Sequence, residues 1–480
     1  MTVRVRQDAY ALPSGDMTLD WYRQAVALMQ SRGLDDPTSW WWIGAVHGRP
    51  QPPQFPPAPV GASAFWDQCQ HQTWFFLPWH RGYLAAFEAT VAKAVEELGG
   101  PTDWALPYWN YSESLVTNPE ARRLPPAFRS PNLSDGSPNA LFAPRGADAN
   151  GEFGLRSVDV SLDALTQSVF TPVSGVSAGF GGPSTGFSHF GMASGALENI
   201  PHNVLHGRIG GWMGNPNTAA FDPIFWLHHC NIDRLWEVWR DADPAHLNPA
   251  DPDWLANVPF ELHDEDGTPF SFTSAEMENT TTVLHGYQYD SVPPPAVVVA
   301  GGPTGGVTEM ADLESPPELA GASEAPLPLR GDRTPAKVRI DTAGLDRMSE
   351  GLLAPSVKVY LRLEGVRGTG VPADYDVLID LEGDGIEPIQ VGVLSTFGVA
   401  NASDPESDHG GVGITQVFDI TASAERLNLT DGSASELNVS FHRVAQGPVT
   451  EMALPLVDGG DVPAEAASSV EIGRIGVYFE

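Results

Sequence analysis

Seven of the chain's 13 histidines stand among large apolar residues, and this placement restricts the possible folds more than any other feature of the sequence. Apolar neighbours predict that these side chains are buried. Burying an imidazole without a partner costs free energy, so the fold has to bring the rings to shared partners from distant parts of the chain. The seven residues are His47, His71, His80, His202, His206, His228 and His229.

The spacing and setting of these histidines indicate a metal site. His202 and His206 are four residues apart, so on a helix their rings share one face and can chelate one ion. The adjacent pair His228 and His229 lies within an apolar run and strengthens the case. Neutral imidazole suits Zn, Cu, Fe and Ni. A zinc hydrolase of the HExxH type needs Glu where Asn203 stands, and no carboxylate lies at the ligand spacing typical of non-haem iron, so copper is favoured.

The composition divides the 480 residues into two regions joined by a linker. Residues 1–290 contain 11 of the histidines and show helical spacing of apolar residues, whereas residues 291–335 are rich in Pro, Gly and Ala, as expected for a linker. Residues 336–480 alternate apolar and polar side chains in short runs, which predicts an antiparallel β-sandwich. Helices are expected over residues 18–31, 80–98, 202–209 and 227–240.

The charge balance argues against several classes of partner. The formal net charge of −35 repels nucleic-acid phosphates and anionic lipids, so neither is an expected partner.

No run of about 18 apolar residues is present to span a membrane, and the N-terminal segment lacks the apolar core of a Sec signal peptide. We therefore expect a cytoplasmic protein by default. The two cysteines, Cys69 and Cys230, are too few for a disulfide framework.

Three sequence strings are highly specific when they occur together. They are HxxxxFLPWHR, ENxPHNxxH and DPIFWLHHxNIDRLW, and with them the chain resembles the type 3 copper family of tyrosinases, catechol oxidases and other polyphenol oxidases, with haemocyanins as relatives. Tyr287-Gln288-Tyr289 looks like the Tyr-x-Tyr motif that closes the catalytic core in this family. The resemblance covers residues 1–290 well and the C-terminal region loosely. It implies a mainly α catalytic domain, a four-helix bundle with long loops, followed by an all-β sandwich.

The resemblance also implies a cofactor of two copper ions, with O2 as cosubstrate. Carried over position by position, copper A is bound by His47, His71 and His80, and copper B by His202, His206 and His229. Of the adjacent pair, the family pattern assigns the ligand to the second histidine, which leaves His228 beside the site. Phe76 and Phe225 are expected to pack around the rings.

Two further features near the ligands each allow two interpretations. Cys69 lies two residues before His71, the Cys-x-His arrangement that in some relatives carries a thioether between sulfur and imidazole; the alternative is a free buried thiol. Glu198 precedes His202 by four residues and Asn203 follows it directly. In similar enzymes this pair holds a water that can accept a phenol proton. Glu198 can instead bind the free N–H groups at the start of a helix.

Asp233 and Gly207 are the remaining candidate positions. Asp233 lies four residues after His229, so it can orient that ring by hydrogen bonding, or it can pair with Arg234 or another base. Gly207 directly follows His206 and is a small residue at a position thought to tune the choice of substrate in relatives.

The implied reaction uses O2 to hydroxylate monophenols, to oxidise o-diphenols to o-quinones, or both. Two alternatives stay open: an oxidase limited to diphenols or o-aminophenols, and a haemocyanin-like O2-binding protein. A single catalytic unit without tandem repeats argues against the O2 carrier. In relatives of similar architecture the β domain lies over the copper site and keeps the enzyme inactive. We therefore expect a latent enzyme with small phenols as its partners.

Overall fold

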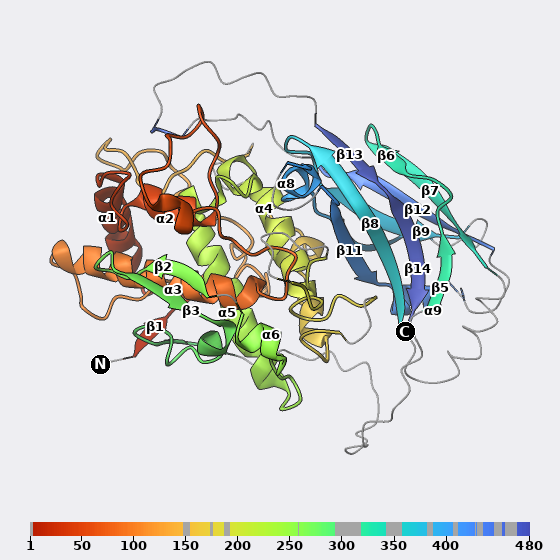
Figure 1. Cartoon of the computed structure of the whole chain (residues 1–480), viewed down its shortest axis with the longest axis horizontal. Coiled ribbons are helices and arrows are strands. Elements are labelled where there is room, and N and C mark those ends of the chain that lie inside the picture. Colours follow the sequence, from red (N-terminus) through yellow and green to blue (C-terminus); the bar gives the residue numbers. More distant parts are fainter. Residues whose placement is uncertain are drawn as a thin grey trace.

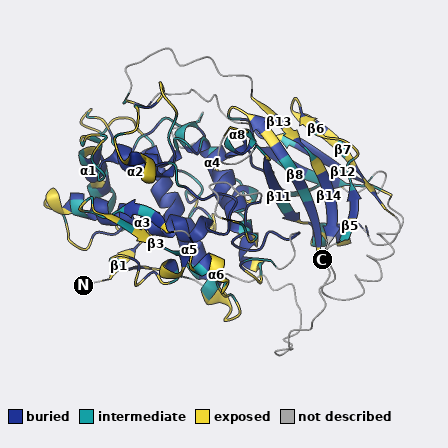
Figure 2. Cartoon of the chain, in the orientation of Figure 1, coloured by how far each residue is buried: buried dark blue, intermediate teal, exposed yellow. Residues whose placement is uncertain are grey.

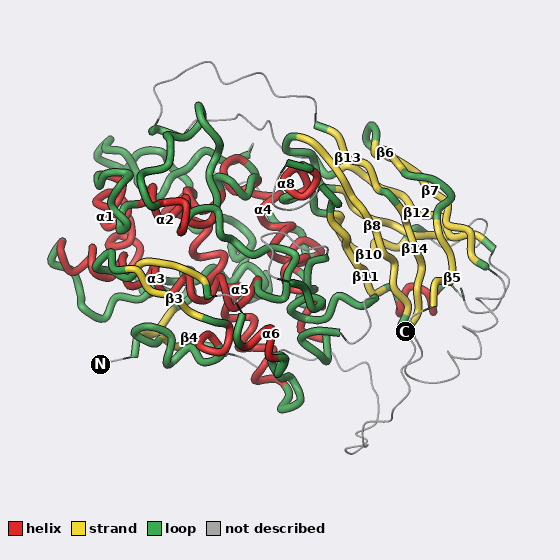
Figure 3. The backbone as a smooth tube through the Cα atoms, viewed as in Figure 1, coloured by secondary structure: helices red, strands yellow, loops and turns green. Residues whose placement is uncertain are grey.

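Most of the helices lie in one half of the molecule and most of the strands in the other (Figure 1, Figure 3). The computed structural model places a helical domain, built from the N-terminal part of the chain, beside a β domain built from the C-terminal part. The described residues are 3–146, 154–172, 176–186, 193–257, 259–292, 318–341, 358–381, 387–406, 411–427, 429, 435–445, 454–456 and 468–480.

The helical domain contains the helices that the sequence predicts, with small differences at their ends. The predicted helix over 80–98 begins earlier, at Phe76, and the one over 227–240 begins at Pro223. Short strand pairs cover the domain's edge: β1 (Arg4–Arg6) with β4 (Tyr287–Tyr289), and β2 (Phe260–His263) with β3 (Pro269–Phe272). The helices are α1 Thr18–Gln30, α2 Trp40–His47, α3 Phe76–Glu97, α4 Val204–Ile209, α5 Pro223–Ala242 and α6 Pro252–Leu255.

α3 and α5 form the centre of this domain and are buried over most of their length (Figure 2). Asp222 begins α5, because its carboxylate accepts a hydrogen bond from the N–H of Ile224 at 3.0 Å. Pro223 occupies the first helical position, where its missing N–H is no loss. The two helices meet where Phe87 stacks on Trp226, with ring centroids 3.4 Å apart.

None of the described helices combines the length and the apolar character that a membrane span requires.

The β domain is a ten-stranded sheet in which the described strands pair antiparallel. The pairing order is β10-β9-β12-β7-β5-β14-β8-β13-β6, and β11 pairs with β8. Two short helices, α8 Val399–Ser403 and α9 Thr421–Arg426, interrupt the strands. The strands are β5 Glu318–Ala322, β6 Leu327–Leu329, β7 Arg333–Ile340, β8 Val359–Thr369, β9 Tyr375–Asp380, β10 Ile389–Leu394, β11 Ile414–Asp419, β12 Glu436–Arg443, β13 Ser469–Ile472 and β14 Arg474–Phe479.

Strands that are far apart in this order share one hydrophobic core. Val377 of β9, Val439 of β12 and Leu361 of β8 belong to the same buried cluster. The ring of Phe418 in β11 fills the space beside Gly392 in β10, where a Cβ atom would lie 2.5 Å from it. A flat sheet could not bring these strands together. The sheet therefore folds over on itself as the predicted sandwich.

The predicted linker over 291–335 extends too far towards the C-terminus. β5 and β6 both lie within that range, and they pair with β7, β14 and β13 of the sandwich. Their sequences, ELAGA and LPL, have weak strand propensity, and the pairing with neighbouring strands overrides it. Pro328 is tolerated because β6 is the last strand of the order. The first described strand of the β domain thus begins at Glu318, ahead of the predicted boundary at 336, and residues 293–317 lie outside the described residues.

The two domains contact each other beside α4 and α8 (Figure 1). Arg156 of the helical domain forms a bidentate ion pair with Asp376 of β9, with N–O distances of 2.7 and 2.8 Å. Phe397, which precedes α8, and Leu454 are buried within the hydrophobic core of the helical domain. The β domain is therefore packed against the helical domain through both polar and apolar contacts.

Candidate metal centre

Two groups of buried histidines meet inside the helical domain. In each group the candidate ligand atoms lie within 4.8 Å of one another. The first group comes from the end of α2, the loop before α3 and α3 itself. The second comes from the π-helical segment Glu198–Asn203 that leads into α4, from α4 and from α5. The groups are His47, His71 and His80, and His202, His206, His228 and His229.

Backbone carbonyls fix the tautomer of three of these rings. A carbonyl oxygen only accepts hydrogen bonds, so the Nδ1 atom that faces it must carry the proton, and Nε2 keeps its lone pair for a metal. Nε2 of His47 and of His80 are buried without a hydrogen-bond partner among the residues that the structure describes. The three bonds are His47 Nδ1 to Pro216 O at 3.0 Å, His80 Nδ1 to Phe76 O at 2.8 Å, and His206 Nδ1 to Met213 O at 2.8 Å.

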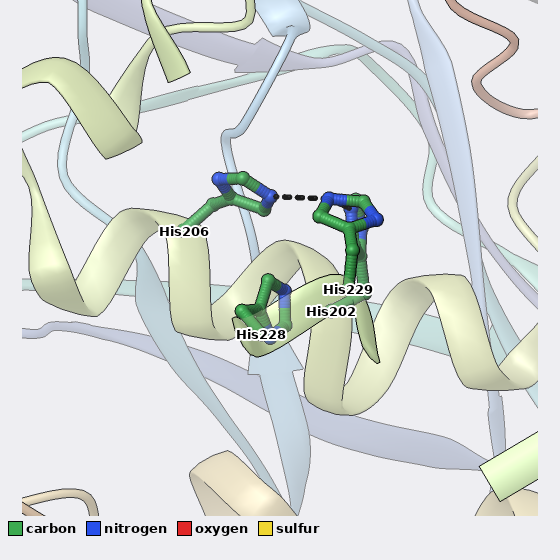
Figure 4. A group of neighbouring side chains, drawn as sticks. All are labelled: His202, His206, His228 and His229. Atoms are coloured by element: carbon green, nitrogen blue, oxygen red, sulfur yellow. Dashed lines mark hydrogen bonds between the residues drawn. The ribbon is translucent and has the colours of Figure 1, made fainter. Parts of the chain in front are cut away.

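The second group converges on its Nε2 atoms (Figure 4). His229 Nε2 lies 3.3 Å from His202 Nε2 and 3.4 Å from His206 Nε2. The Nδ1 atom of His202 donates to Asn203 Oδ1 at 2.9 Å, so its Nε2 also has a free lone pair. Nitrogens about 3.3 Å apart can surround one ion with metal–nitrogen bonds of about 2.0–2.1 Å. This donor set therefore fits a metal ion.

His228 and His229 are distinguished by what their rings contact. His228 forms a hydrogen bond of 3.1 Å from its Nδ1 to the hydroxyl of Tyr111, and its ring stacks on His202 with centroids 5.3 Å apart. His229 instead brings Nε2 to the other two rings and stacks on His80 of the first group, with centroids 4.4 Å apart and an interplanar angle of 15°. The geometry favours His229 over His228 as the third ligand.

Five of the candidate ligand rings are neutral, and metal binding requires neutral imidazole. Burial lowers the pKa of His47 and of His202 to about 3. Burial lowers the pKa of His80, His206 and His229 well below the usual range, and neighbouring imidazoles add to this effect. No proton has to leave these rings near neutral pH before an ion can bind.

Two phenylalanines pack around the two groups. The ring of Phe76 lies 4.6 Å, between centroids, from both His80 and His202, and so touches both groups. The ring of Phe225 lies 4.1 Å from that of His229 and 4.9 Å from that of His47. These contacts restrict the orientations of the histidine rings.

Cys69 is close to one of the candidate ligands. Its sulfur lies 3.4 Å from Nδ1 of His71, and the side chain is buried. Burial raises the pKa of the Cys69 thiol well above its ordinary value, so the thiol is neutral. Cys230 is also buried and free.

Glu198 connects the two histidine groups. Its Oε1 accepts a hydrogen bond of 2.7 Å from the N–H of Gln72, the residue after His71. Gln72 has a φ of 56°, a left-handed conformation that only a few per cent of non-glycine residues adopt, and the bond helps to hold it. Glu198 Oε2 has no hydrogen-bond partner in the described part of the chain. Burial raises the pKa of Glu198 to about 8.

Asp233 does not orient the ring of His229. Nδ1 of His229 has no hydrogen-bond partner within the described ranges. Asp233 pairs with a base instead, and the base is not Arg234: its carboxylate accepts from Arg81 Nε at 2.6 Å and from Arg6 Nη1 at 3.4 Å. The hydroxyls of Tyr287 and Tyr289 also donate to it, each at 2.6 Å. The Tyr-x-Tyr strand thus joins α3 to α5 through one buried carboxylate.

Phe397 of the β domain belongs to the site, although no sequence pattern indicated it. Its ring stacks on His206 with centroids 4.1 Å apart and an interplanar angle of 15°, and it lies 5.9 Å from His202. It stands in a Ser-Thr-Phe-Gly turn between β10 and α8, with no local motif to mark it. The β domain therefore covers the second histidine group with an aromatic ring.

Two protein-family models match this chain, one in each domain. Residues 37–158 and 156–242 match the common central domain of tyrosinase, and residues 316–480 match a Domain of unknown function (DUF7868). Tyrosinase HcTyr1 from Hahella sp. (strain CCB-MM4) is 39% identical over 461 residues, which cover 89% of this chain and 92% of that protein. The chloroplastic polyphenol oxidase of Vitis vinifera is 30% identical over 290 residues, 57% of this chain but only 45% of that relative.

Solved structures share the two-domain fold. Latent apple tyrosinase has a TM-score of 0.63 at 20% identity, over 100% of this chain and 97% of that one. Recombinantly expressed latent aurone synthase, a polyphenol oxidase, has a TM-score of 0.62 at 18% identity, over 100% of this chain and 89% of that one. The fold and the two histidine groups define a dicopper oxidoreductase. The chain belongs to the tyrosinase family and is a type 3 copper phenol oxidase.

Proposed function

We propose that this enzyme hydroxylates monophenols and oxidises o-diphenols, and that its β domain keeps it latent. The observation that carries the first part is the pair Glu198 and Asn203 beside His202. Glu198 Oε2 is buried and lacks a partner among the described residues, so it offers an acceptor for a water close to the site. The 39% identity to a protein named a tyrosinase over nearly its whole length supports the same activity.

Six histidines would hold the copper ions: His47, His71 and His80 for copper A, and His202, His206 and His229 for copper B. When bound, the copper pair supplies the activation of O2 and the uptake of electrons from the phenol. The chain positions the substrate ring and moves its proton. Asn203 Nδ2 donates to Ser194 Oγ at 3.3 Å, which holds the amide beside His202. A water held by the ionised form of Glu198, which a pKa of about 8 makes the major form only above that pH, would take the phenol proton as a general base.

The substrate range is tested with the copper-loaded enzyme. We load the protein with copper without air, admit O2, and supply tyrosine, a catechol and an o-aminophenol separately. The proposal predicts product from tyrosine as well as from the catechol. Turnover of the catechol or the o-aminophenol with none of tyrosine, in enzyme freed of its β domain, would show a diphenol- or aminophenol-limited oxidase instead.

Replacing Glu198 with Gln, or Asn203 with Ala, should reduce hydroxylation of monophenols more than oxidation of catechols. A general base contributes about 10²–10⁴-fold, and a catechol is the more acidic substrate and needs less help. The measurement is the ratio of the two turnover rates in the same preparation. A ratio equal to that of the parent enzyme would assign the pair a purely structural role, such as holding Gln72.

We further propose a thioether between Cys69 and His71. Bond formation removes the thiol hydrogen and one ring hydrogen, and O2 with copper is the oxidant. The metal-free protein should therefore be lighter than its sequence mass by two hydrogen atoms after copper and O2 treatment, and peptide mapping should join the two side chains. The 3.4 Å distance between the Cys69 sulfur and Nδ1 of His71, which is bonded to ring carbons, supports this. A Cys69 thiol that still reacts with an alkylating reagent after the treatment would refute it.

Latency is supported by the position of Phe397. A phenol has to reach the histidine groups to react, and the Phe397 ring already stacks on His206. Because the β domain is part of the same chain, Phe397 competes with substrate at a high effective concentration. Phe397 would then be the side chain that blocks the site.

A further inference from the structure

Position 207 has no room for a side chain, because Asp374 of the β domain fills the space. A Cβ atom built on Gly207 would lie 2.2 Å from Asp374 Oδ2 and 2.9 Å from its Cγ. Carbon and other heavy atoms normally stay about 3.5–4.0 Å apart. Gly207 directly follows the candidate ligand His206 in α4. The two domains can meet in this register only with glycine at position 207.

Asp374 is not free to turn away. It is 1% exposed, and its Oδ1 accepts hydrogen bonds from the N–H of Thr396 at 2.8 Å and from the Thr396 hydroxyl at 3.2 Å. Rotating the carboxylate would leave a buried N–H without its partner, which is unfavourable. A side chain at position 207 therefore has to push the β domain away or break the bonds to Thr396.

Two polar contacts between the domains oppose a sliding movement that would relieve the contact. Arg208, the next residue of α4, donates a hydrogen bond to Ala445 O in the β domain at 3.3 Å. On the other side, Arg156 holds Asp376, two residues after Asp374, through its bidentate ion pair. These bonds flank Gly207 and fix its register against Asp374.

A side chain at position 207 would displace Phe397 in either case, because Thr396, which Asp374 holds, directly precedes Phe397. One oxygen of Asp374 holds the turn that carries Phe397, and the other rests on the backbone beside His206, on which Phe397 stacks. We propose that Asp374 is the positioning residue that seats Phe397 over the copper-B histidines, and that glycine at position 207 is required for this closure. The inference rests on the proposed latency. It implies that substitutions at position 207 act on latency before they act on substrate choice.

The test uses the copper-loaded full chain and two alanine substitutions at the same interface. Gly207→Ala should raise catechol turnover roughly tenfold, because overpacking by one carbon should destabilise the closed contact between the domains by about that factor. Gly214→Ala is the matched control, since its Cβ would lie an ordinary 3.8 Å from Val371 of the β domain, and it should keep the low turnover of the parent. After cleavage and release of the β domain, both variants should match the released parent.

Two substitutions of Asp374 test the positioning role, including the case that Gly207→Ala fails to fold. Asp374→Asn keeps an acceptor for Thr396 and should stay latent, whereas Asp374→Ala should be active without cleavage. Hydrogen exchange of the turn 395–398 should be faster in Gly207→Ala and Asp374→Ala, and unchanged in Asp374→Asn and Gly214→Ala.

The outcomes separate this inference from the latency proposal itself. If release of the β domain activates the parent but neither Gly207→Ala nor Asp374→Ala does, only the role of the Gly207–Asp374 contact is wrong. If Gly207→Ala changes turnover by the same factor before and after release, position 207 acts on the substrate and the inference is overturned. If confirmed release leaves the parent unchanged, the latency proposal fails and the inference fails with it.

Discussion

Replacing His229 with alanine should reduce phenol oxidation to background and remove one copper ion per chain. His229 Nε2 lies 3.3 and 3.4 Å from the Nε2 atoms of His202 and His206, so its loss leaves copper B with two ligands. Among the described residues, His228 is the only other imidazole placed to substitute for it. That ring is held by Tyr111 and would have to leave this bond.

His228→Ala is the matched comparison, one residue away in the same helix. It should keep both copper ions and lose about 10–100-fold in activity, the usual effect of removing a group that supports a ligand. Copper content and catechol turnover are measured for both variants. The reverse order, with His228→Ala losing copper and His229→Ala retaining it, would show that His228 is the ligand.

Separating the β domain should raise turnover of bulky phenols by one to two orders of magnitude. Phe397 gives up its burial, about 1.5–3 kcal/mol for such a side chain, and an aromatic stack of about 0.5–1.5 kcal/mol, when substrate displaces it. Cleavage has to fall within residues 293–317, because β5 begins at Glu318 and is held in the sheet. Mild detergent or acid should mimic the cut by weakening the interface.

Phe397→Ala provides the same test without cleavage. It removes the ring that stacks on His206 and leaves the Arg156–Asp376 ion pair in place. Turnover is measured before and after limited proteolysis, with release of the β domain confirmed by size exclusion. Unchanged turnover after confirmed release would reject latency and leave the β domain a role in folding or copper loading.

The helical domain could be predicted from the sequence because its signals are local. The four-residue spacing of His202 and His206, and the helical spacing of apolar residues over 18–31 and 80–98, each report on a few neighbouring residues. The histidines also had to be buried together, since isolated imidazoles in an apolar core are costly. The grouping of His47 with His71 and His80 depended on the resemblance to a family, and the structure brings those three rings together.

What could not be predicted depends on contacts between distant segments. Phe397 reaches His206 only because the β domain packs beside α4, and no pattern in its turn indicates this. The small residues of β5 resemble a linker until β7 and β14 pair with them on both sides. Asp233 was close enough in sequence to serve His229, but Arg81 and Arg6 reach it from other elements. Tertiary packing decided each case.

The copper content of the purified full chain tests the central claim most directly. Six histidines in two buried groups, each with its candidate ligand atoms within 4.8 Å of one another, predict two copper ions per chain after copper-replete expression. The measurement is elemental analysis against protein concentration, with cobalt, nickel, iron and zinc determined in the same sample. Two copper ions per chain and negligible amounts of the other metals would agree with the account. A single ion per chain, or zinc in place of copper, would contradict it.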